Sequence, residues 1–366
     1  NFGGGYASSI GGGGGNAAAS RFGVVAGGYT NFVSNDSHAA FIGGGYTNSV
    51  HTANQAVVAG GRSNTATGGD YAVIGGGLFN IAHSKYGVNA GGYANYNSAV
   101  ASSIGGGWGN NASSPYAAIA GGYFNSITGV AEGSAVGGGK GNLVHSSTAV
   151  VAGGYSNMVT NDGSGSFIGG GHLNIAESWL GVVSGGYSNT NSGYVGAVCG
   201  GRNNTLVSDA GVIGGGASNT ASSKYGVISG GFSNSNSGVA SSIGGGWRNN
   251  ASAASAVIAG GEANAVSPVG SHSAVGGGYG NRASGVCGVV AGGNSNSASG
   301  FSSVVAGGLH NTIASSYAVI GGGESNNITS NSGESFIGGG QRNTADSRFS
   351  VVAGGYSGYG GGYASA

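Results

Sequence analysis

The fold is decided by one stretch, Ala149-Val150-Val151-Ala152-Gly153-Gly154-Tyr155-Ser156-Asn157-Met158-Val159, whose pattern recurs along the chain. We count positions from the Asn of each Gly-Gly-x-x-Asn as position 0. Position −6 is Ile or Val in every copy except the one that holds Asn89, and position +2 is mostly Ala, Val, Ile or Leu. Side chains that alternate at i and i+2 lie on one face of a strand, not of a helix. Each copy therefore predicts two short strands joined by a glycine turn.

The copies follow one another at a step of 15 residues, occasionally 16 or 17. So constant a step predicts one coil per repeat. We predict an all-β fold, a parallel β-solenoid (β-roll) of about 23 coils, in a single continuous array over residues 1–366. Stacking places each Asn above the next, where its amide can bond to other amides and to turn backbone. This predicted structural ladder includes Asn16, Asn31, Asn48, Asn64, Asn80, Asn157, Asn219 and Asn311.

Composition excludes several classes of protein. Gly is 88 of 366 residues, Pro is 2, and 5% of the chain is charged. Collagen needs Gly at every third position with abundant Pro, and disordered Gly/Ser tracts lack a fixed Val or Ile position. The 10 Lys+Arg and 10 Asp+Glu form no basic stripe, so we expect no nucleic-acid partner. No apolar run approaches the length of a membrane span, so we expect no membrane insertion by this segment.

Position −7, on the opposite face of the first strand, is also apolar or small. Apolar residues on both faces predict a strand that is buried on both. One face would fill the interior of the coil, and the other would pack on a second layer, most simply another copy of the chain. We therefore predict a homo-oligomer or filament. The apolar residues at this position include Val24, Phe41, Val57, Val88, Phe167, Val289 and Phe336.

Position −2 carries many aromatic residues, for which two interpretations stay open. They can form an exposed ladder that stacks on sugar rings or on neighbouring fibres. Alternatively, they are turn residues that shield the glycine-rich corner. The candidate surface-binding aromatics are Tyr29, Tyr46, Tyr93, Trp108, Tyr123, Tyr155, Tyr187, Trp247 and Tyr279.

We find no pattern that predicts catalysis, a cofactor or a metal. Catalysis needs converging acids, bases or nucleophiles, whereas Glu132, Asp162 and Glu177 fall in separate coils as single charges. The seven His share no metal-ligand spacing. Cys199 and Cys287 lie about six coils apart, beyond disulfide reach, and the small-residue position of Cys199 predicts a packed side chain. We expect a protein that is not an enzyme.

Two stretches carry a family resemblance: Ala318-Val319-Ile320-Gly321-Gly322-Gly323 and Ser303-Val304-Val305-Ala306-Gly307-Gly308, each followed by x-x-Asn-x-apolar. They resemble the head repeats of trimeric autotransporter adhesins of the YadA type, and the Gly-Gly-Gly-x-x-Asn arrays of tail-fibre-like proteins. The resemblance covers essentially the whole chain. It implies a left-handed parallel β-roll, three chains side by side as a homotrimer, and surface attachment. The doubled or tripled Gly departs from the adhesin pattern, and we expect no coiled-coil stalk, membrane anchor or self-cleaving chaperone within these 366 residues.

The function we expect is a non-catalytic structural segment of an extracellular fibre or adhesin, at a cell or virion surface, with a glycan or another surface receptor as partner. Two alternatives stay open. One is a phage tail-fibre receptor-binding segment. The other is an ice-binding solenoid, because the repeats also resemble those of plant β-roll ice-binding proteins, which read x-x-Asn-x-Val-x-Gly. Residues 360–365 repeat residues 3–8 in the same positions, so we expect a segment of a longer chain or fibre.

Overall fold

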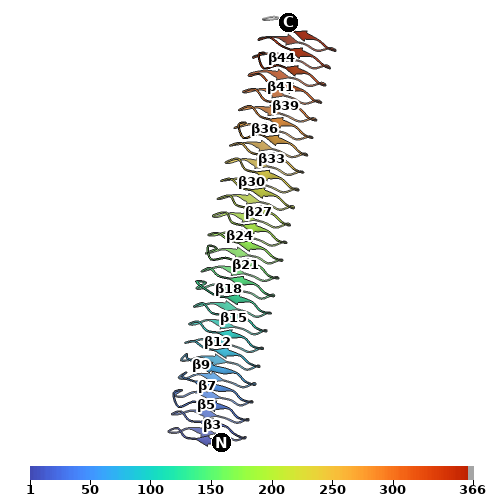
Figure 1. The fold of residues 1–366 in the computed structure, drawn as a ribbon. Helices are drawn as coiled ribbons and strands as arrows, with labels where there is room; N and C mark the ends of the chain where they lie inside the picture. The colour runs from blue at the N-terminus through green and yellow to red at the C-terminus, as the bar shows by residue number, and fades with distance from the viewer. Residues whose placement is uncertain (362–366) are drawn as a thin grey trace. The chain divides into compact units, whose positions relative to one another are not determined.

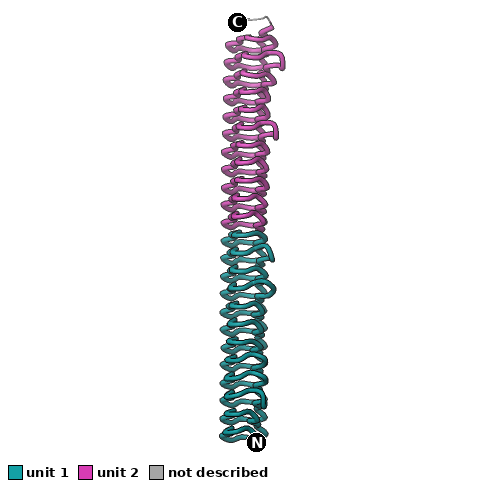
Figure 2. The backbone as a smooth tube through the Cα atoms, turned by 90° about the vertical axis from the view of Figure 1, so that its left-hand side faces the viewer, with its two compact units in different colours: residues 1–187 teal, residues 188–366 magenta. Residues whose placement is uncertain are grey.

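The computed structural model describes residues 1–361; the end of the C-terminal repeat match, residues 362–366, lies outside them. The described residues form strands β1 to β47 and no helix. The chain divides into two compact units, unit 1 (residues 1–187) and unit 2 (residues 188–366) (Figure 2). In each unit it winds as a stack of coils (Figure 1). The predicted all-β parallel β-solenoid is therefore confirmed.

Each coil contributes two strands. Odd-numbered strands are the two residues that follow position 0, as in β21 (Met158–Val159), and even-numbered strands are positions −7 and −6, as in β20 (Val150–Val151). Only β7 (Ser49–His51) and β9 (Thr65–Thr67) extend one residue further. We call the odd-numbered strands the asparagine sheet and the even-numbered strands the valine sheet. Strands that carry the argument below are β12 (Val88–Asn89), β13 (Tyr96–Asn97), β14 (Ser103–Ile104), β16 (Ala118–Ile119), β17 (Ser126–Ile127), β18 (Ala135–Val136), β22 (Phe167–Ile168), β25 (Thr190–Asn191), β27 (Thr205–Leu206), β29 (Thr220–Ala221), β45 (Thr344–Ala345) and β47 (Tyr359–Gly360).

Within each unit, a strand pairs in parallel with the equivalent strand of the next coil. Val150 of β20 is in register with Phe167 of β22, for example, so the same position of the repeat recurs along each sheet. Positions −6 and +2 point inward from the two sheets and are buried, as Val151 and Val159 show with no exposed surface. The core position inferred from the sequence is therefore correct. The interior of a coil is thin, which explains the small residues at position −8, such as the buried Ala149.

The two glycines before position −2 are not equivalent. Gly154 has a φ of 91°, and a Cβ added there would collide with the carbonyl oxygen of Gly171 and lie 2.6 Å from Asn157 Nδ2. Gly153 has no positive φ, and a Cβ added there would meet nothing within 4 Å. In this coil the glycine at position −3 is thus required by backbone conformation and by close approach of the next coil, whereas the one at position −4 is not.

Both turns of the coil also contain residues other than Gly in the left-handed region. Ser156, just before position 0, has a φ of 51°, and Thr148, in the opposite turn, has a φ of 53°. Such backbone is uncommon outside Gly, Asn and Asp. Here the neighbouring coil holds it, because the Ser156 amide donates to Lys140 O at 2.9 Å and the Thr148 amide donates to Glu132 O at 2.8 Å.

From the coil of Gly27 to the coil of Gly170, unit 1 has a two-coil period at the glycine corner. The glycine at position −4 has a φ of 155° in Gly106 and 153° in Gly138, whereas Gly121, in the coil between them, has no positive φ. Position −5 alternates in step, because a Cβ added at Gly105 would collide with the carbonyl oxygen of Ala120 in the next coil. Alternation between Gly and Ala runs through Gly75, Ala90, Gly105, Ala120, Gly137 and Ala152.

Candidate functional site

The buried asparagines form a ladder whose main partners are backbone groups. Asn64 donates from its backbone N to Asn48 Oδ1 at 3.0 Å, and its Oδ1 accepts from the backbone N of Asn80 at 2.9 Å. Its Nδ2 donates to Gly60 O at 3.0 Å and to Gly77 O at 2.9 Å. Amide-to-amide contacts are the longer ones, 3.2 Å from Asn64 Nδ2 to Asn48 Oδ1. Each side chain therefore ties the glycine turn to the following coil. Equivalent backbone-to-Oδ1 bonds are received by Asn16, Asn31, Asn48, Asn80, Asn157, Asn219 and Asn311.

The outer face of the valine sheet, made by positions −7 and −5, is apolar in both units. We call it the apolar face. Position −7 is Val, Phe, Ala or Ser throughout, position −5 is Gly, Ala, Ser or Cys, and neither position holds a charged residue. In the single chain this face is open, with Phe41 39% and Phe167 40% exposed. Its predicted cover, a second copy of the chain, stays a prediction.

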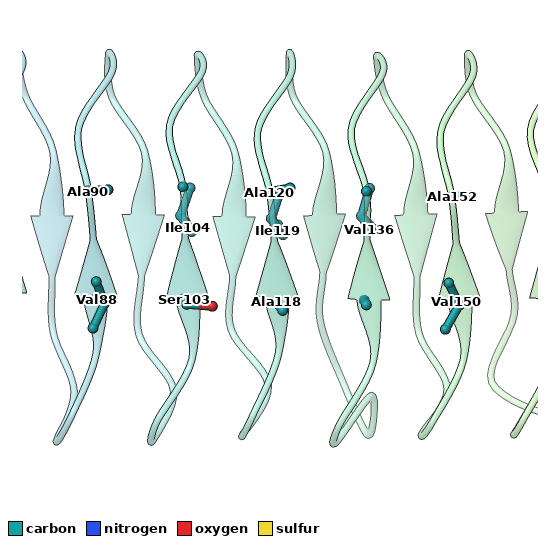
Figure 3. A pocket seen from close by; sticks show the side chains of 13 residues that line it. Val88, Ala90, Ser103, Ile104, Ala118, Ile119, Ala120, Val136, Val150 and Ala152 are labelled. Carbon is teal, nitrogen blue, oxygen red and sulfur yellow. The ribbon is translucent and has the colours of Figure 1, made fainter.

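The apolar face of unit 1 is hollowed between Val88 of β12 and Val150 of β20. The outward side chains between them are small, Ser103, Ala118 and Ala135, and leave a shallow depression of about 480 Å³. Figure 3 shows Ser103 and Ala118 as short side chains on β14 and β16, with the larger Val88 and Val150 on either side.

The outer face of the asparagine sheet, positions +1 and +3, is mixed: position +3 is mostly polar, whereas position +1 in unit 1 also holds the apolar side chains of Ile81, Leu143, Met158 and Ile175. It carries hydroxyl, amide and imidazole groups with single charges, such as Glu177, Arg282 and Asp346. In unit 2 three threonines stand in register on β25, β27 and β29. The outer face of the asparagine sheet thus carries charged groups, which the apolar face lacks.

Aromatic residues at position −2 line the glycine corner, where each pairs in parallel with the residue of the neighbouring coil. Most are exposed, including Trp108 at 48%, whereas Tyr123 is half-buried. They pack in two ways. Tyr29 and Tyr46 are stacked, with ring centroids 5.4 Å apart and planes at 12°. The six other candidates lie at the same corner. Four of them are in unit 1, Tyr93, Trp108, Tyr155 and Tyr187, and two are in unit 2, Trp247 and Tyr279.

In the middle of unit 1 the rings meet at steep angles. Trp108 lies 5.1 Å from Tyr93 at 68° and 5.2 Å from Tyr123 at 77°. Lys140 continues the row, with Nζ 5.2 Å from the ring centroid of Tyr123 and 5.4 Å from that of Tyr155. Sequence reasoning did not include this lysine, although it occupies the same position −2.

His172 is the other member of the row that sequence reasoning missed. Its ring lies 4.7 Å from Tyr155 at 66° and 5.1 Å from Tyr187 at 79°. It too occupies position −2, so a search by position, and not by aromatic residue type, would have found it.

A polar cluster inside unit 1 was also missed. Asn89 replaces the core Ile or Val of position −6, and Asn97 replaces the apolar residue of position +2; both are fully buried. Asn97 Nδ2 donates to Val88 O at 3.0 Å and to Ser102 O at 2.8 Å. Asn89 Nδ2 donates to Asn95 O at 3.1 Å, while its Oδ1 has no hydrogen-bond partner among the described residues.

Ionisable groups are scattered and serve contacts between coils. Near the end of unit 2, Thr329 Oγ1 donates to Asp346 Oδ1 at 2.6 Å and Tyr359 OH donates to Asp346 Oδ2 at 3.0 Å, and these bonds lower the pKa of the Asp346 carboxyl. The hydrogen bond between Tyr359 and Asp346 also raises the pKa of Tyr359. Glu334 pairs with Arg348 at 2.9 Å, and that hydrogen bond lowers its pKa.

Within residues 1–361, no group of three or more His, Cys, Asp or Glu side chains is placed to hold a metal ion. Both thiols, Cys199 and Cys287, are free and exposed. The expectation that Cys199 is packed was wrong, because position −5 points to solvent from the valine sheet. The described part of the chain also includes no helix that could cross a membrane.

These surfaces belong to a parallel β-solenoid with one uncharged apolar outer face, one mixed outer face and an aromatic corner. No protein-family model and no curated protein matches the chain.

Proposed function

We propose that this chain is a non-catalytic structural segment of an extracellular fibre or adhesin, and that it associates with further copies of itself through the apolar face. The observation that carries the proposal is the composition of that face, which lacks charge at positions −7 and −5 in both units. Large exposed apolar faces on soluble proteins mark interaction sites. The resemblance to YadA-type head repeats supports a trimer at a cell or virion surface.

The energy available on this face is sufficient for association. Full burial of a Val or Phe side chain contributes about 1.5–3 kcal/mol, so a side chain that is 40% exposed, such as Phe167, retains roughly half of that for an interface. Association costs about 4–15 kcal/mol. Fewer than a dozen such residues on each copy would therefore offset it.

The depression next to β16 gives this proposal a sharp test. Ala118→Lys would place a charge in the proposed interface, whereas Ser126→Lys, on the outer face of the asparagine sheet in the same coil, would keep its charge in water. We expect wild type and Ser126→Lys to sediment as one oligomer in analytical ultracentrifugation, and Ala118→Lys to dissociate. A wild-type chain that remains monomeric across micromolar concentrations, or equal behaviour of the two variants, would contradict the proposal.

Ice binding is a second candidate, favoured by the threonine column on β25, β27 and β29. Thr190 is in register with Thr205, and Thr205 with Thr220, so three hydroxyls repeat at the coil spacing on one face of unit 2. Thermal hysteresis of the purified chain tests it, with Thr205→Lys as the disrupting variant. Absence of both hysteresis and ice shaping would remove this candidate.

A further inference from the structure

We infer that unit 1 binds a linear β-1,4-linked glycan along a row of four tyrosines at its glycine corner, Tyr93, Tyr123, Tyr155 and Tyr187. The inference rests on the proposed attachment function for its biological role, and it names the chemical class of the ligand. The observation that supports this inference is the spacing of the tyrosines along the corner. The tyrosines occupy position −2 in every second coil, with Trp108, Lys140 and His172 in the coils between.

The two-coil spacing is built into the backbone. Tyr123 and Tyr155 stand in coils with Ala at position −5 and no positive φ at position −4, whereas Lys140, between them, stands in a coil in which Gly138 has a φ of 153°. Parallel coils lie about 4.8 Å apart, so successive tyrosines lie about 9.6 Å apart. Tyr93, Tyr123 and Tyr155 therefore stand in equivalent backbone surroundings, whereas the coil of Tyr187 has Ser184 at position −5 and a φ of 158° at Gly185.

Trp108 and His172 stand at steep angles to the neighbouring tyrosines, whereas Lys140 lies over the rings of Tyr123 and Tyr155. His172 stands at 66° to Tyr155 and at 79° to Tyr187, and Trp108 is similarly steep to the tyrosines on either side of it. A row of parallel rings would cover its own faces, whereas a row with alternating orientation leaves ring surface for a ligand. Tyr93, Tyr155 and Tyr187 are 39%, 43% and 44% exposed, whereas Tyr123 is half-buried and has the ring of Phe124 4.5 Å away.

The spacing selects the ligand. An extended β-1,4-linked glycan turns over at each sugar, so it presents the same apolar ring face once per disaccharide, a repeat close to the rise of two coils. An extended peptide presents the same face every two residues, about 6.6 Å, and does not match. Nucleic acid is disfavoured because Lys140 and His172 are the row's only basic groups, too few to neutralise a phosphate backbone. They suit hydrogen bonds to sugar hydroxyls instead.

The chain contains its own control. Tyr29 and Tyr46 occupy the same position −2 in unit 1, but in adjacent coils, and their planes differ by 12°. Their facing surfaces are used on each other. A double Ala substitution there removes as much aromatic surface as one at Tyr93 and Tyr155 without touching the two-coil row.

The experiment is isothermal titration of the full chain with cellohexaose and chitohexaose, and with α-linked maltohexaose as the ligand that lacks the repeat. We expect a β-linked hexasaccharide to bind, and Tyr93→Ala/Tyr155→Ala to weaken it roughly tenfold or more. The Tyr29→Ala/Tyr46→Ala control should stay within about twofold of wild type. Tyr93→Trp/Tyr155→Trp should retain binding, because tryptophan keeps an aromatic ring face at both positions.

No binding of either β-linked ligand, equal binding of maltohexaose, or an equal loss in the control would overturn the inference. Circular dichroism checks that each variant is folded, and sedimentation reports the oligomer separately. An oligomer that binds no glycan would sink this inference and leave the proposed self-association standing. A monomer that binds the glycan would do the reverse.

Discussion

Replacing one asparagine of the ladder should remove hydrogen bonds to the coil that follows it and destabilise that coil. Asn64→Ala removes the Oδ1 that accepts from the buried backbone N of Asn80, and the Nδ2 that donates to Gly60 O and Gly77 O. The Gly77 carbonyl keeps a second partner, because it also accepts from the Arg62 amide at 2.9 Å. The Asn80 amide and the Gly60 carbonyl lose their side-chain partner.

The expected cost follows from those two groups. A buried donor left without a partner costs about 1–3 kcal/mol, and the carbonyl of the half-buried Gly60 adds about 1 kcal/mol. We therefore expect a loss of about 2–4 kcal/mol in the free energy of unfolding. Thr65→Ala is the matched control, since Thr65 points outward and shares one hydroxyl contact of 3.1 Å with Ser49; it should change stability by about 0.5 kcal/mol or less.

Native-state hydrogen exchange can show on which side of the substituted residue the backbone loses protection. The backbone N at position 64 still donates to Asn48 Oδ1 in the variant, so its exchange should stay slow, while the amide of Asn80 should exchange faster. Because coils contact mainly their neighbours, the change should remain local. Equal stability of Asn64→Ala and Thr65→Ala, or faster exchange at position 64 instead of 80, would refute this account.

The remaining predictions concern the same ladder, the glycine corner, the core and the end of unit 2. Asn64→Asp keeps the oxygen that accepts from Asn80 but places a buried carboxylate against two carbonyl oxygens. Burial raises the pKa of that carboxyl, so the variant should be less stable than wild type at neutral pH and regain stability as pH falls, which denaturation at a series of pH values would show. Gly60→Ala should be neutral or stabilise by about 0.4–1 kcal/mol, whereas Gly61→Ala, at a φ of 87°, should cost at least about 1–3 kcal/mol in chemical denaturation; similar results for the pair would contradict their assigned difference. Asn89→Val removes the unpartnered Oδ1 and should stabilise by roughly 1 kcal/mol, with Ser103→Ala on the outer face as control. The pKa of Asp346 is lowered by Thr329 and Tyr359, so its contribution to stability is complete above the unfolded pKa and is lost as pH falls through the folded one; exchange of the Thr344 amide, which donates to Gly358 O at 2.8 Å, should rise there, and Asp346→Asn should abolish that pH dependence.

Much of the fold could be read from the repeat. The period-2 pattern around Val151 and Val159 identifies strands and their buried face, and the constant step of the Asn residues identifies the coil, because these signals depend only on neighbours along the chain. The aromatic positions were found in the same way. Lys140 and His172 were missed because residue type, and not position, guided the search.

The contacts between coils could not be predicted from the repeat pattern. The sequence by itself determined the solenoid, its core, its asparagine rungs and the apolar character of the valine sheet's outer face. Only the tertiary structure decided that Gly154 is required while Gly153 is not, that Cys199 faces solvent, and that the corner alternates every two coils. The physical reason is steric: whether a Cβ or a ring fits depends on the backbone of the coil above, which lies one full repeat away in the sequence.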